Sequence, residues 1–401
     1  MKYYAFLEEI ERTGEQLTVV LDAIPQEVVF EGKIRQELDS IRTFQFELVI
    51  IKKDLRRRYN KKTLMLNRWY ELTTSRNDDG IKGIRYSLED EQVLEMNIDF
   101  IKVLDRRNRL QKELMKSSSL DFLSDATSEE ITNCLPVLKV NQNILMKVMD
   151  VGQGNSIAFM ENEEFKDLFY VDVGGGIMRN RGTYKDNNVS YNPQDNALIV
   201  LTHWDMDHWV SLIRKPNMNK TKLLVPRQKP LGLSHVKLAA KLASQDRLLI
   251  WPDSKSELNS DLLDIHKLKK HKNRNYSGLV VVAKTDHAGL KNTLITGDAP
   301  YKKCDFLGKY DINTVVVPHH GGNFSPDKVP SAPNQHIAIY SYGTGNSYGH
   351  PHQLTLDNHH VKGWTNKYIT VGNDIIISNQ WIKECDSYSL RLQGYELVKY
   401  F

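Results

Sequence analysis

The stretch Leu201-Thr202-His203-Trp204-Asp205-Met206-Asp207-His208 follows an apolar run and holds two histidines and two aspartates within six positions. Imidazole and carboxylate groups are the side chains that proteins offer to divalent ions such as Zn²⁺ and Mn²⁺. The preceding residues, 197–201, predict a buried strand, which places all four side chains on one turn where they can reach one or two ions. The alternative is a surface turn of hydrogen-bonded His and Asp, but chance rarely clusters these residues so closely.

Three more predicted strands downstream end in residues of the same kind. Residues 293–296 precede Gly297-Asp298, and residues 314–317 precede Pro318-His319-His320-Gly321-Gly322. A fourth strand, 337–340, precedes a loop with Tyr348-Gly349-His350-Pro351-His352. Ordinary turn chemistry explains each segment alone. Four strand ends with His or Asp in one region are better explained by convergence on a metal centre.

The composition limits the class of protein. A chain of 401 residues with 40% hydrophobic residues indicates two domains, or three, with real cores. Its net charge of +4 permits a nucleic-acid or phosphate partner without requiring one. No apolar run is long enough to cross a membrane, and the N-terminus has acidic residues where a signal peptide is apolar, so we expect a cytoplasmic protein with no membrane partner. The distant cysteines Cys134, Cys304 and Cys385 fit a reducing compartment and exclude a disulfide scaffold.

The first part of the chain, residues 1–140, predicts a helical, coiled-coil-like module followed by a linker. Apolar residues there recur at steps of three, four and seven, which favours a helical hairpin or small bundle. They are Ile34, Leu38, Ile41, Leu48 and Leu55 in one helix and Val93, Leu94, Ile98, Ile101, Leu104 and Leu110 in the other, with a turn at Asn77-Asp78-Asp79-Gly80. Basic residues on these helices are interpreted as a solvated face rather than a nucleic-acid patch, because acidic residues balance them. The apolar seam is a candidate surface for self-association or a protein partner.

The second part, residues 141–401, contains all 13 histidines and short β-rich segments punctuated by Gly and Asp. We expect strands at 144–151, 168–173, 197–201, 279–283, 293–296, 314–317 and 337–340, and helices at 234–243 and 258–268. Strands with intervening helices predict an α/β sandwich of sheets covered by helices.

As a set, these motifs resemble the metallo-β-lactamase fold superfamily, in particular its branch related to the hydrolase domain of the competence protein ComEC. The matching segments are Asp150-Val151-Gly152-Gln153-Gly154-Asn155-Ser156, Val171-Asp172-Val173-Gly174, the turn at 203–208, Thr296-Gly297-Asp298, Pro318-His319-His320-Gly321 and Tyr348-Gly349-His350-Pro351. The resemblance covers roughly residues 144–380 and implies an α/β fold of the αββα sandwich type. It leaves the helical module that we expect before this sandwich unexplained.

The resemblance also implies a hydrolytic site with two divalent metal ions, zinc or manganese. The expected ligands are His203, Asp205 and His320 for one ion, Asp207, His208 and His350 for the other, and Asp298 as a bridge. His319 is expected to face the substrate and contact phosphate, so that Asp207, Asp298 and His319 are the catalytic candidates. Asp172 and Asp150 are expected behind the ligands, orienting them. The choice between His319 and His320, and between His350 and His352, stays open.

Several residues bear on the substrate. The family usually has Asp where this chain has Asn155, and Asn275 and Ser277 are further candidates to hydrogen-bond substrate. Trp204 and Trp209 are either packed core or a platform for stacking bases. Three carboxylates among the ligands make Mn²⁺ competitive with Zn²⁺. Basic residues at 214–229 and 267–274 either ring a cleft for phosphate backbones or solubilise loops.

The leading hypothesis is a cytoplasmic metal-dependent phosphodiesterase, a nuclease acting on DNA through a dinuclear metal-activated hydroxide. By analogy of context alone, phage defence (an antiviral role) or DNA processing is a plausible setting. The runner-up is hydrolysis of a small phosphodiester, ester, lactone or amide. A third reading is a non-catalytic interaction subunit that works through its N-terminal part. Truncation near residue 140 is expected to separate the last reading from the first two.

Overall fold

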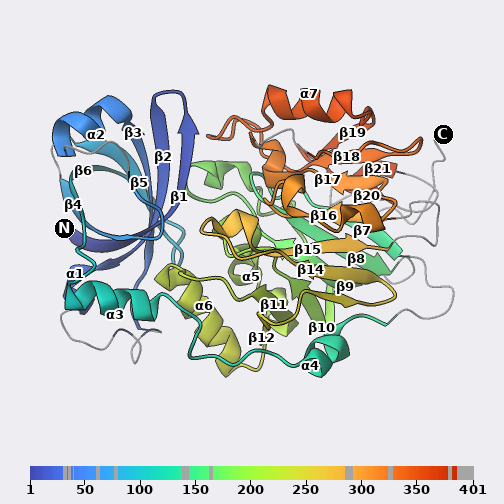
Figure 1. The fold of residues 1–401 in the computed structure, drawn as a ribbon, viewed down its shortest axis with the longest axis horizontal. Coiled ribbons are helices and arrows are strands. Elements are labelled where there is room, and N and C mark those ends of the chain that lie inside the picture. Colours follow the sequence, from blue (N-terminus) through green and yellow to red (C-terminus); the bar gives the residue numbers. More distant parts are fainter. Residues whose placement is uncertain are drawn as a thin grey trace. The chain divides into compact units, whose positions relative to one another are not determined.

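The computed structural model describes most of the chain (Figure 1). The described residues are 1–29, 34, 38, 40–59, 64–75, 80–137, 144–161, 166–284, 292–323, 328–377 and 382–385. They form two compact units, one made of Met1–Ser124 with Gln228–Gln245, the other of Asp125–Arg227 with Asp246–Phe401. Within the described ranges, no helix is long and apolar enough to cross a membrane.

The smaller unit is built on a closed β-barrel with the strand order β1-β2-β3-β5-β6-β4 (Figure 1). Its strands are β1 (Lys2–Thr13), β2 (Gln16–Pro25), β3 (Phe44–Ile51), β4 (Trp69–Ser75), β5 (Ile81–Ser87) and β6 (Val93–Val103). The short helices α1 (Gln26–Val29) and α2 (Lys52–Tyr59) lie between strands, and α3 (Arg109–Ser117) follows the last one. Closure removes the exposed edges that an open sheet would present.

The expected helical hairpin is therefore wrong for the described residues of this region. In β3 the side chains of Phe44, Phe46, Leu48 and Ile50 are all buried, so the apolar period is two, which belongs to a strand. Leu48 and Leu55 are seven residues apart, as on one helix face, but Leu48 lies in β3 and Leu55 in α2, which follows β3 directly. The turn expected at Asn77-Asp78-Asp79 and most residues around Ile34 and Leu38 lie outside the described residues.

The smaller unit also contains helix α6 (Leu233–Ser244), which confirms the helix expected at 234–243. Carboxylates from the barrel strands accept hydrogen bonds at its first turn. The Gly232 amide donates to Glu8 Oε1 at 3.0 Å, and the Ser234 amide donates to Asp22 Oδ2 at 2.8 Å. His235, fully buried on this helix, lies 3.0 Å from Glu8 Oε1 through its Nε2 atom. A segment distant in sequence is thus held to β1 and β2 by buried polar contacts.

The larger unit has two sheets, which makes it a mixed α/β fold consistent with a metallo-β-lactamase-like sandwich. The first sheet has the order β12-β11-β10-β9-β8-β7-β20-β21 and the second the order β13-β14-β15-β16-β17-β18-β19. The first comprises β7 (Ile144–Val148), β8 (Ser156–Glu161), β9 (Asp167–Val173), β10 (Pro193–Val200), β11 (Lys222–Pro226), β12 (Leu248–Trp251), β20 (Asp374–Ile377) and β21 (Ile382–Cys385). The second comprises β13 (Glu257–Asn259), β14 (Leu263–Lys267), β15 (Leu279–Ala283), β16 (Thr293–Ile295), β17 (Thr314–Val316), β18 (Ile337–Tyr340) and β19 (Lys367–Ile369).

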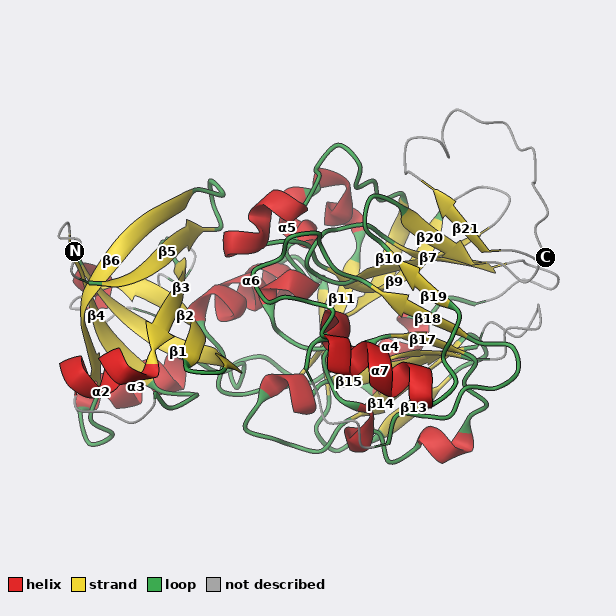
Figure 2. Ribbon diagram, turned by 90° about the horizontal axis from the view of Figure 1, so that it is seen from above, coloured by secondary structure: helices red, strands yellow, loops and turns green. Residues whose placement is uncertain are grey.

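One apolar core joins the two sheets of the larger unit. Phe169 and Val171 from the first sheet and Val281 and Ile339 from the second belong to the same buried cluster. The helices α4 (Ser128–Cys134), α5 (Ser211–Arg214) and α7 (Gln353–Val361) lie on the outside of the strands (Figure 2). The two faces of apolar side chains, packed together, form the frame that holds the loops at the strand ends.

The strands expected in this unit are all present, within a few residues at their ends. The helix expected at 258–268 is wrong, because this segment forms the antiparallel pair β13 and β14. Leu263 and Ile265 are buried on alternate positions of β14, and the Ser260 side chain bonds the Leu263 backbone in the turn. Short apolar runs do not distinguish a buried strand from a helix by periodicity alone.

Burial of Asp374 at the start of β20 predicts a specific pH dependence of stability. Burial raises the pKa of its carboxyl to about 6, and Asp374 Oδ1 accepts the Asp150 amide. Because the folded pKa lies above the unfolded value, this group stabilises the fold at low pH and loses that contribution as pH rises through about 6. We expect the free energy of unfolding of Asp374→Asn, relative to that of wild type, to be about 1 kcal/mol higher at pH 8 than at pH 5. Urea unfolding at both pH values measures this gain, with the exposed Asp261→Asn as a control that should show none.

Candidate metal centre

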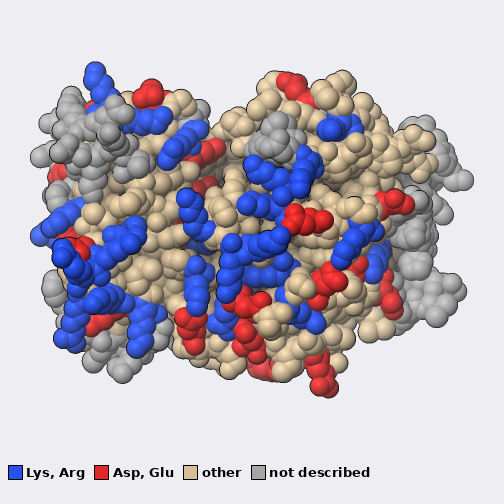
Figure 3. Space-filling model, viewed as in Figure 1, with Lys and Arg blue, Asp and Glu red and all other residues tan. Residues whose placement is uncertain are grey.

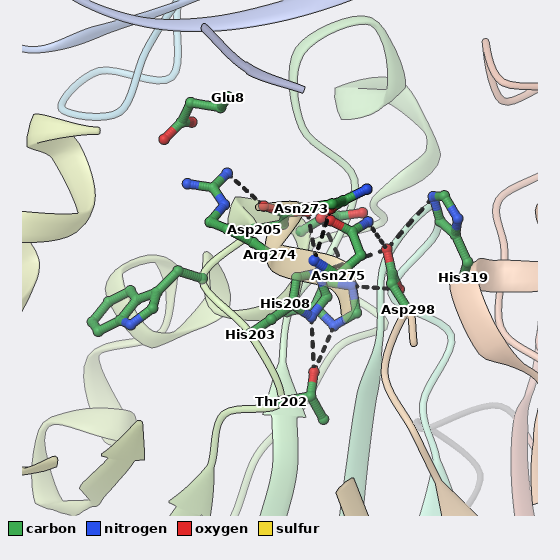
Figure 4. Close-up of polar contacts among 12 residues, drawn as sticks. Glu8, Thr202, His203, Asp205, His208, Asn273, Arg274, Asn275, Asp298 and His319 are labelled. Carbon is green, nitrogen blue, oxygen red and sulfur yellow. Dashed lines mark hydrogen bonds and ion pairs between the residues drawn. The ribbon is translucent and has the colours of Figure 1, made fainter. Parts of the chain in front are cut away.

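The predicted site residues come from strand ends on one edge of the sandwich. Strands β9 and β10 are parallel neighbours in the first sheet, and β16, β17 and β18 are parallel neighbours in the second. Because the carboxyl ends of parallel strands share an edge, the loops that follow them meet there. Asp172, the turn at 203–208, Asp298 and the turn at 318–321 all lie at these ends, and Figure 4 shows several of their side chains pointing toward one another.

Asp172 orients the metal-ligand turn from behind. Its Oδ1 accepts the Thr202 amide at 2.7 Å, and its Oδ2 accepts the Thr202 hydroxyl at 2.8 Å. The same Oδ2 lies 2.7 Å from Nδ1 of His208. Asp172 is fully buried and has a positive φ of 56°, an uncommon conformation for a non-glycine residue. A carboxylate on Nδ1 fixes the ring and leaves Nε2 facing the site, which is the role expected for this residue.

Two further buried histidines of the cluster are also held through Nδ1. His320 Nδ1 lies 3.0 Å from the Ser341 carbonyl oxygen, and His203 Nδ1 lies 3.1 Å from the Thr202 hydroxyl. In both rings Nε2 is then the atom that faces the carboxylates. Thr202 and Ser341 were not singled out from the sequence, although Thr202 stands inside the decisive stretch.

Asp298 lies at the centre of the cluster. Its Oδ1 is 3.0 Å from His208 Nε2 and 3.6 Å from His320 Nε2. Its Oδ2 is 3.6 Å from Nε2 of both His203 and His319 (Figure 4). Burial opposes ionisation of Asp298, but the surrounding histidines, His319 first, outweigh it and hold the pKa of its carboxyl well below its usual range. Asp298 therefore lies among the expected ligands, and its role as a bridge between two ions stays a prediction.

The donor set fits one or two divalent ions. At this site, two groups of side chains have ligand atoms within 4.8 Å of one another: His203, His208 and Asp298, and Asp207, His208 and His320. Nε2 of His208, Nε2 of His320 and Oδ1 of Asp298 are buried, and Oδ1 lies 3.0 and 3.6 Å from the two nitrogens. None of the three atoms makes a hydrogen bond of good geometry with a described residue. Buried polar atoms are normally hydrogen-bonded, so three that converge without such bonds call for a ligand. The expected division of ligands between two ions stays a prediction, since His320 here groups with Asp207 and His208.

Asp205 has a partner that the sequence did not reveal. Arg274 Nη2 lies 2.5 Å from Asp205 Oδ1, and Asp205 Oδ2 lies 3.1 Å from His203 Nε2 (Figure 4). Both members of the Arg274–Asp205 pair are 8% exposed. Burial opposes ionisation, but the charges of Arg274 and then His203 hold the pKa of the Asp205 carboxyl well below its usual range. The sequence analysis treated Arg274 only as one of several basic residues. Its position next to Asn275, a candidate site residue, could have indicated that it lies near the centre.

His319 and His350 complete the ring of imidazoles. His319 is 27% exposed in its side chain, whereas His320 is 3% exposed, so His319 is the histidine of this pair that a substrate can reach. The His350 ring centroid lies 5.3 Å from that of His319 and 6.2 Å from that of His320. Gln153 Nε2 lies 3.0 Å from His350 Nδ1. Gln153 is a further residue that sequence reasoning missed, although it belongs to the quoted glycine-rich segment.

The remaining candidates lie at different distances from the centre. Asn275 Nδ2 donates to Asp298 Oδ2 at 3.3 Å, and Asn155 Nδ2 donates to Asp172 Oδ2 at 3.4 Å. The Ser277 hydroxyl contacts backbone carbonyl oxygens of its own turn. Asp150 accepts backbone amides of Gly152 and Gly372, so it holds loops rather than a ligand side chain. For Ser277 and Asp150, the described contacts therefore support a structural position.

The two tryptophans beside the turn are core residues. Trp204 and Trp209 are 0% and 1% exposed, and their indole nitrogens donate to the carbonyl oxygens of Pro226 and Trp204. Neither ring is available to stack a base. Packing also explains Gly174, since a Cβ there would overlap the Asp207 carbonyl oxygen, which accepts the Gly175 amide at 3.0 Å.

Many cations of the basic stretches are paired with carboxylates. Red side chains are interspersed among the blue ones on the face of the larger unit drawn in Figure 3. The pairs in this unit include Lys215–Asp186, Lys220–Asp195, Arg227–Asp125, Lys269–Asp305 and Lys270–Asp253. Such pairing reduces the net field that a long phosphate backbone would meet.

Comparisons with known proteins give little beyond the geometry. No family model and no curated protein matches the chain. A solved structure of an archaeal metallo-β-lactamase superfamily protein from Sulfolobus tokodaii is similar over 64% of this chain and 89% of that one, at 14% identity and a TM-score of 0.25. A similarity this low supports no inference about activity. The assignment of a candidate metal centre therefore rests on the buried histidines and carboxylates themselves.

Proposed function

We propose that the chain is a metal-dependent hydrolase, and within that class a phosphodiesterase that cleaves DNA. The observation that carries the proposal is the convergence of His208 Nε2 and His320 Nε2 on Asp298 Oδ1, at 3.0 and 3.6 Å, with all three atoms buried and without a hydrogen bond of good geometry to a described residue. Two divalent ions bound by such a set lower the pKa of a water molecule and offset charge on a phosphoryl oxygen. The ComEC-like resemblance of the motifs supports DNA as the substrate, and a cytoplasmic location is part of the same proposal.

The chain's own residues supply the rest of the site. Asp172 and the Ser341 carbonyl oxygen fix the rings of His208 and His320, so their reactive nitrogens need no reorganisation. His319, partly exposed and 3.6 Å from Asp298 through its Nε2, is positioned to donate a hydrogen bond to a substrate oxygen. Arg274 offsets negative charge on Asp205, which favours an anionic substrate at a site with three carboxylates.

The test is cleavage of labelled single- and double-stranded DNA, with RNA alongside, by metal-stripped protein resupplied with Mn²⁺, Zn²⁺ or Mg²⁺. We expect cleavage to require added metal and to be lost in Asp207→Ala and His208→Ala. Elemental analysis of each variant gives an independent readout, because both changes should also lower the metal content. A wild-type chain that binds no metal would contradict the whole proposal.

A small phosphodiester is the second candidate substrate. The ion pairs of Lys215, Lys220, Lys269 and Lys270 favour it, since they leave fewer cations for an extended backbone. Hydrolysis of bis(p-nitrophenyl) phosphate without cleavage of any nucleic acid would select this candidate.

The N-terminal region was expected to bind a protein partner through helices. Because this region is a β-barrel, the proposed partner would bind the barrel, and pull-down with the full chain tests this.

A further inference from the structure

The loop Asn273–Ser277 is anchored to two carboxylates of the candidate metal centre. Arg274 pairs with Asp205, and its neighbour Asn275 donates to Asp298 (Figure 4). The Asn273 side chain accepts the Asn275 amide at 3.0 Å, and the Ser277 hydroxyl donates to the Arg274 carbonyl oxygen at 3.3 Å. With both its side chains and its backbone held, the loop presents the next residue, Tyr276, in a fixed position.

Tyr276 is half-buried and directly follows Asn275, whose side chain donates to Asp298. Burial and, next, the negative charge of Asp298 raise the pKa of the Tyr276 hydroxyl. Lys303 Nζ lies 5.4 Å from the Tyr276 ring centroid, and the ring of the exposed His271 lies 5.1 Å away. An aromatic ring, an imidazole and an ammonium group thus gather beside the centre.

The cations here differ from those elsewhere in the basic stretches. Lys302 and Lys303 have no ion-pair partner among the residues that the structure describes, whereas Lys269 and Lys270 do. A positive charge without an ion pair to a described residue therefore lies beside an aromatic ring. A duplex binds through a long basic surface and keeps its bases stacked inside the helix, so a single lysine and an aromatic ring offer little to duplex binding. An unpaired nucleotide offers both a base to stack and a phosphate to pair.

We infer that Tyr276, with Lys303 and His271, forms a binding element for single-stranded nucleic acid, in which a base stacks on Tyr276 and the adjoining phosphate pairs with Lys303. The inference rests on the proposed function, because it assigns the strand preference of that same site. Trp204 and Trp209, the aromatic residues first considered for stacking, are enclosed in the core. Tyr276 instead lies on the loop whose Asn275 side chain donates to Asp298.

Binding without cleavage tests the element. Fluorescence anisotropy in EDTA compares labelled oligo(dT) with a labelled duplex of equal length on wild type, Tyr276→Ala, Tyr276→Phe and Lys303→Met. We expect Tyr276→Ala to weaken single-strand binding about 5- to 150-fold and Tyr276→Phe to retain it, since stacking needs only the ring. Lys303→Met should lower the slope of log affinity against log salt by about 0.7, as loss of one phosphate contact does. Lys362→Met, an exposed lysine at the far end of α7, is the matched control and should change neither quantity.

The outcomes separate this inference from the proposed function. Unchanged single-strand affinity in Tyr276→Ala, an equal loss for the duplex, or an equally weak Tyr276→Phe would each overturn the binding element. Failure of wild type to bind oligo(dT) would overturn it as well. Binding that depends on Tyr276 without any metal-dependent cleavage would uphold the element and refute the nuclease activity.

Discussion

Asp298→Asn is expected to abolish metal-dependent hydrolysis while leaving the fold intact. Asp298 lies within 3.0–3.6 Å of four histidine Nε2 atoms, those of His203, His208, His319 and His320. An amide of the same shape removes the negative charge and places an N–H where an acceptor is needed. Loss of an outer partner of a metal ligand costs roughly 10–100-fold, so loss of this central ligand should cost more.

The measurement pairs activity with metal content and with folding. Elemental analysis should show fewer ions per chain, and near-ultraviolet circular dichroism should match that of wild type. Asp261→Asn, an exposed aspartate in the hairpin between β13 and β14, is the matched control and should retain both metal and rate. If Asp298→Asn keeps its metal and its rate, the assignment of the centre is wrong.

Removal of residues 1–124 is expected to unfold or aggregate the remaining chain rather than release a separate hydrolase. Helix α6 buries Leu233, Val236 and Leu242 and belongs to the same compact unit as the barrel. Each large apolar side chain of this helix that becomes exposed costs roughly 1.5–3 kcal/mol, against a total stability of about 5–15 kcal/mol for a typical domain. The buried contact of His235 with Glu8 would be lost too.

A matched pair of fragments shows whether the exposed helix α6 causes the aggregation or whether the larger unit needs the barrel for another reason. Fragment 125–401 is compared with the same fragment in which 228–245 is replaced by a Gly/Ser linker of equal length. We expect size-exclusion chromatography to show aggregation of the first and a monomer for the second. If fragment 125–401 is monomeric and melts at the temperature of the full chain, its folding does not depend on residues 1–124. The chain would then divide into independent parts near residue 140, as the sequence predicted.

The strands and strand ends of the larger unit were predictable because their signals are local. The apolar runs at 279–283 and 314–317 have no competing helical period, and the residues that end them carry metal-binding groups. The barrel was missed because β3 continues directly into α2, which imitates a helical step across two elements. Periodicity reports which side chains share a face, but not where one element stops.

The site could be predicted as a set of residue types but not as a set of contacts. His203, His208 and Asp298 were identified by their clustering, and the structure brings their ligand atoms together. The Arg274–Asp205 pair joins residues that are 69 positions apart, and no local pattern encodes such a pair. The membership of 228–245 in the smaller unit is likewise a tertiary property, since its helical pattern alone gives no information on what it packs against.

The histidine turn after β17 has a consequence for attempts to stabilise this protein. His319 and His320 occupy consecutive left-handed conformations, with φ values of 52° and 54°. Each such residue costs roughly 1–2 kcal/mol relative to glycine in the same conformation, and the sandwich around the turn tolerates that cost. A library selected only for heat resistance would therefore enrich Gly or Asn at these two positions. Thermal selection would erase the histidine pair before it disturbed the core, so any such campaign needs a parallel screen for bound metal.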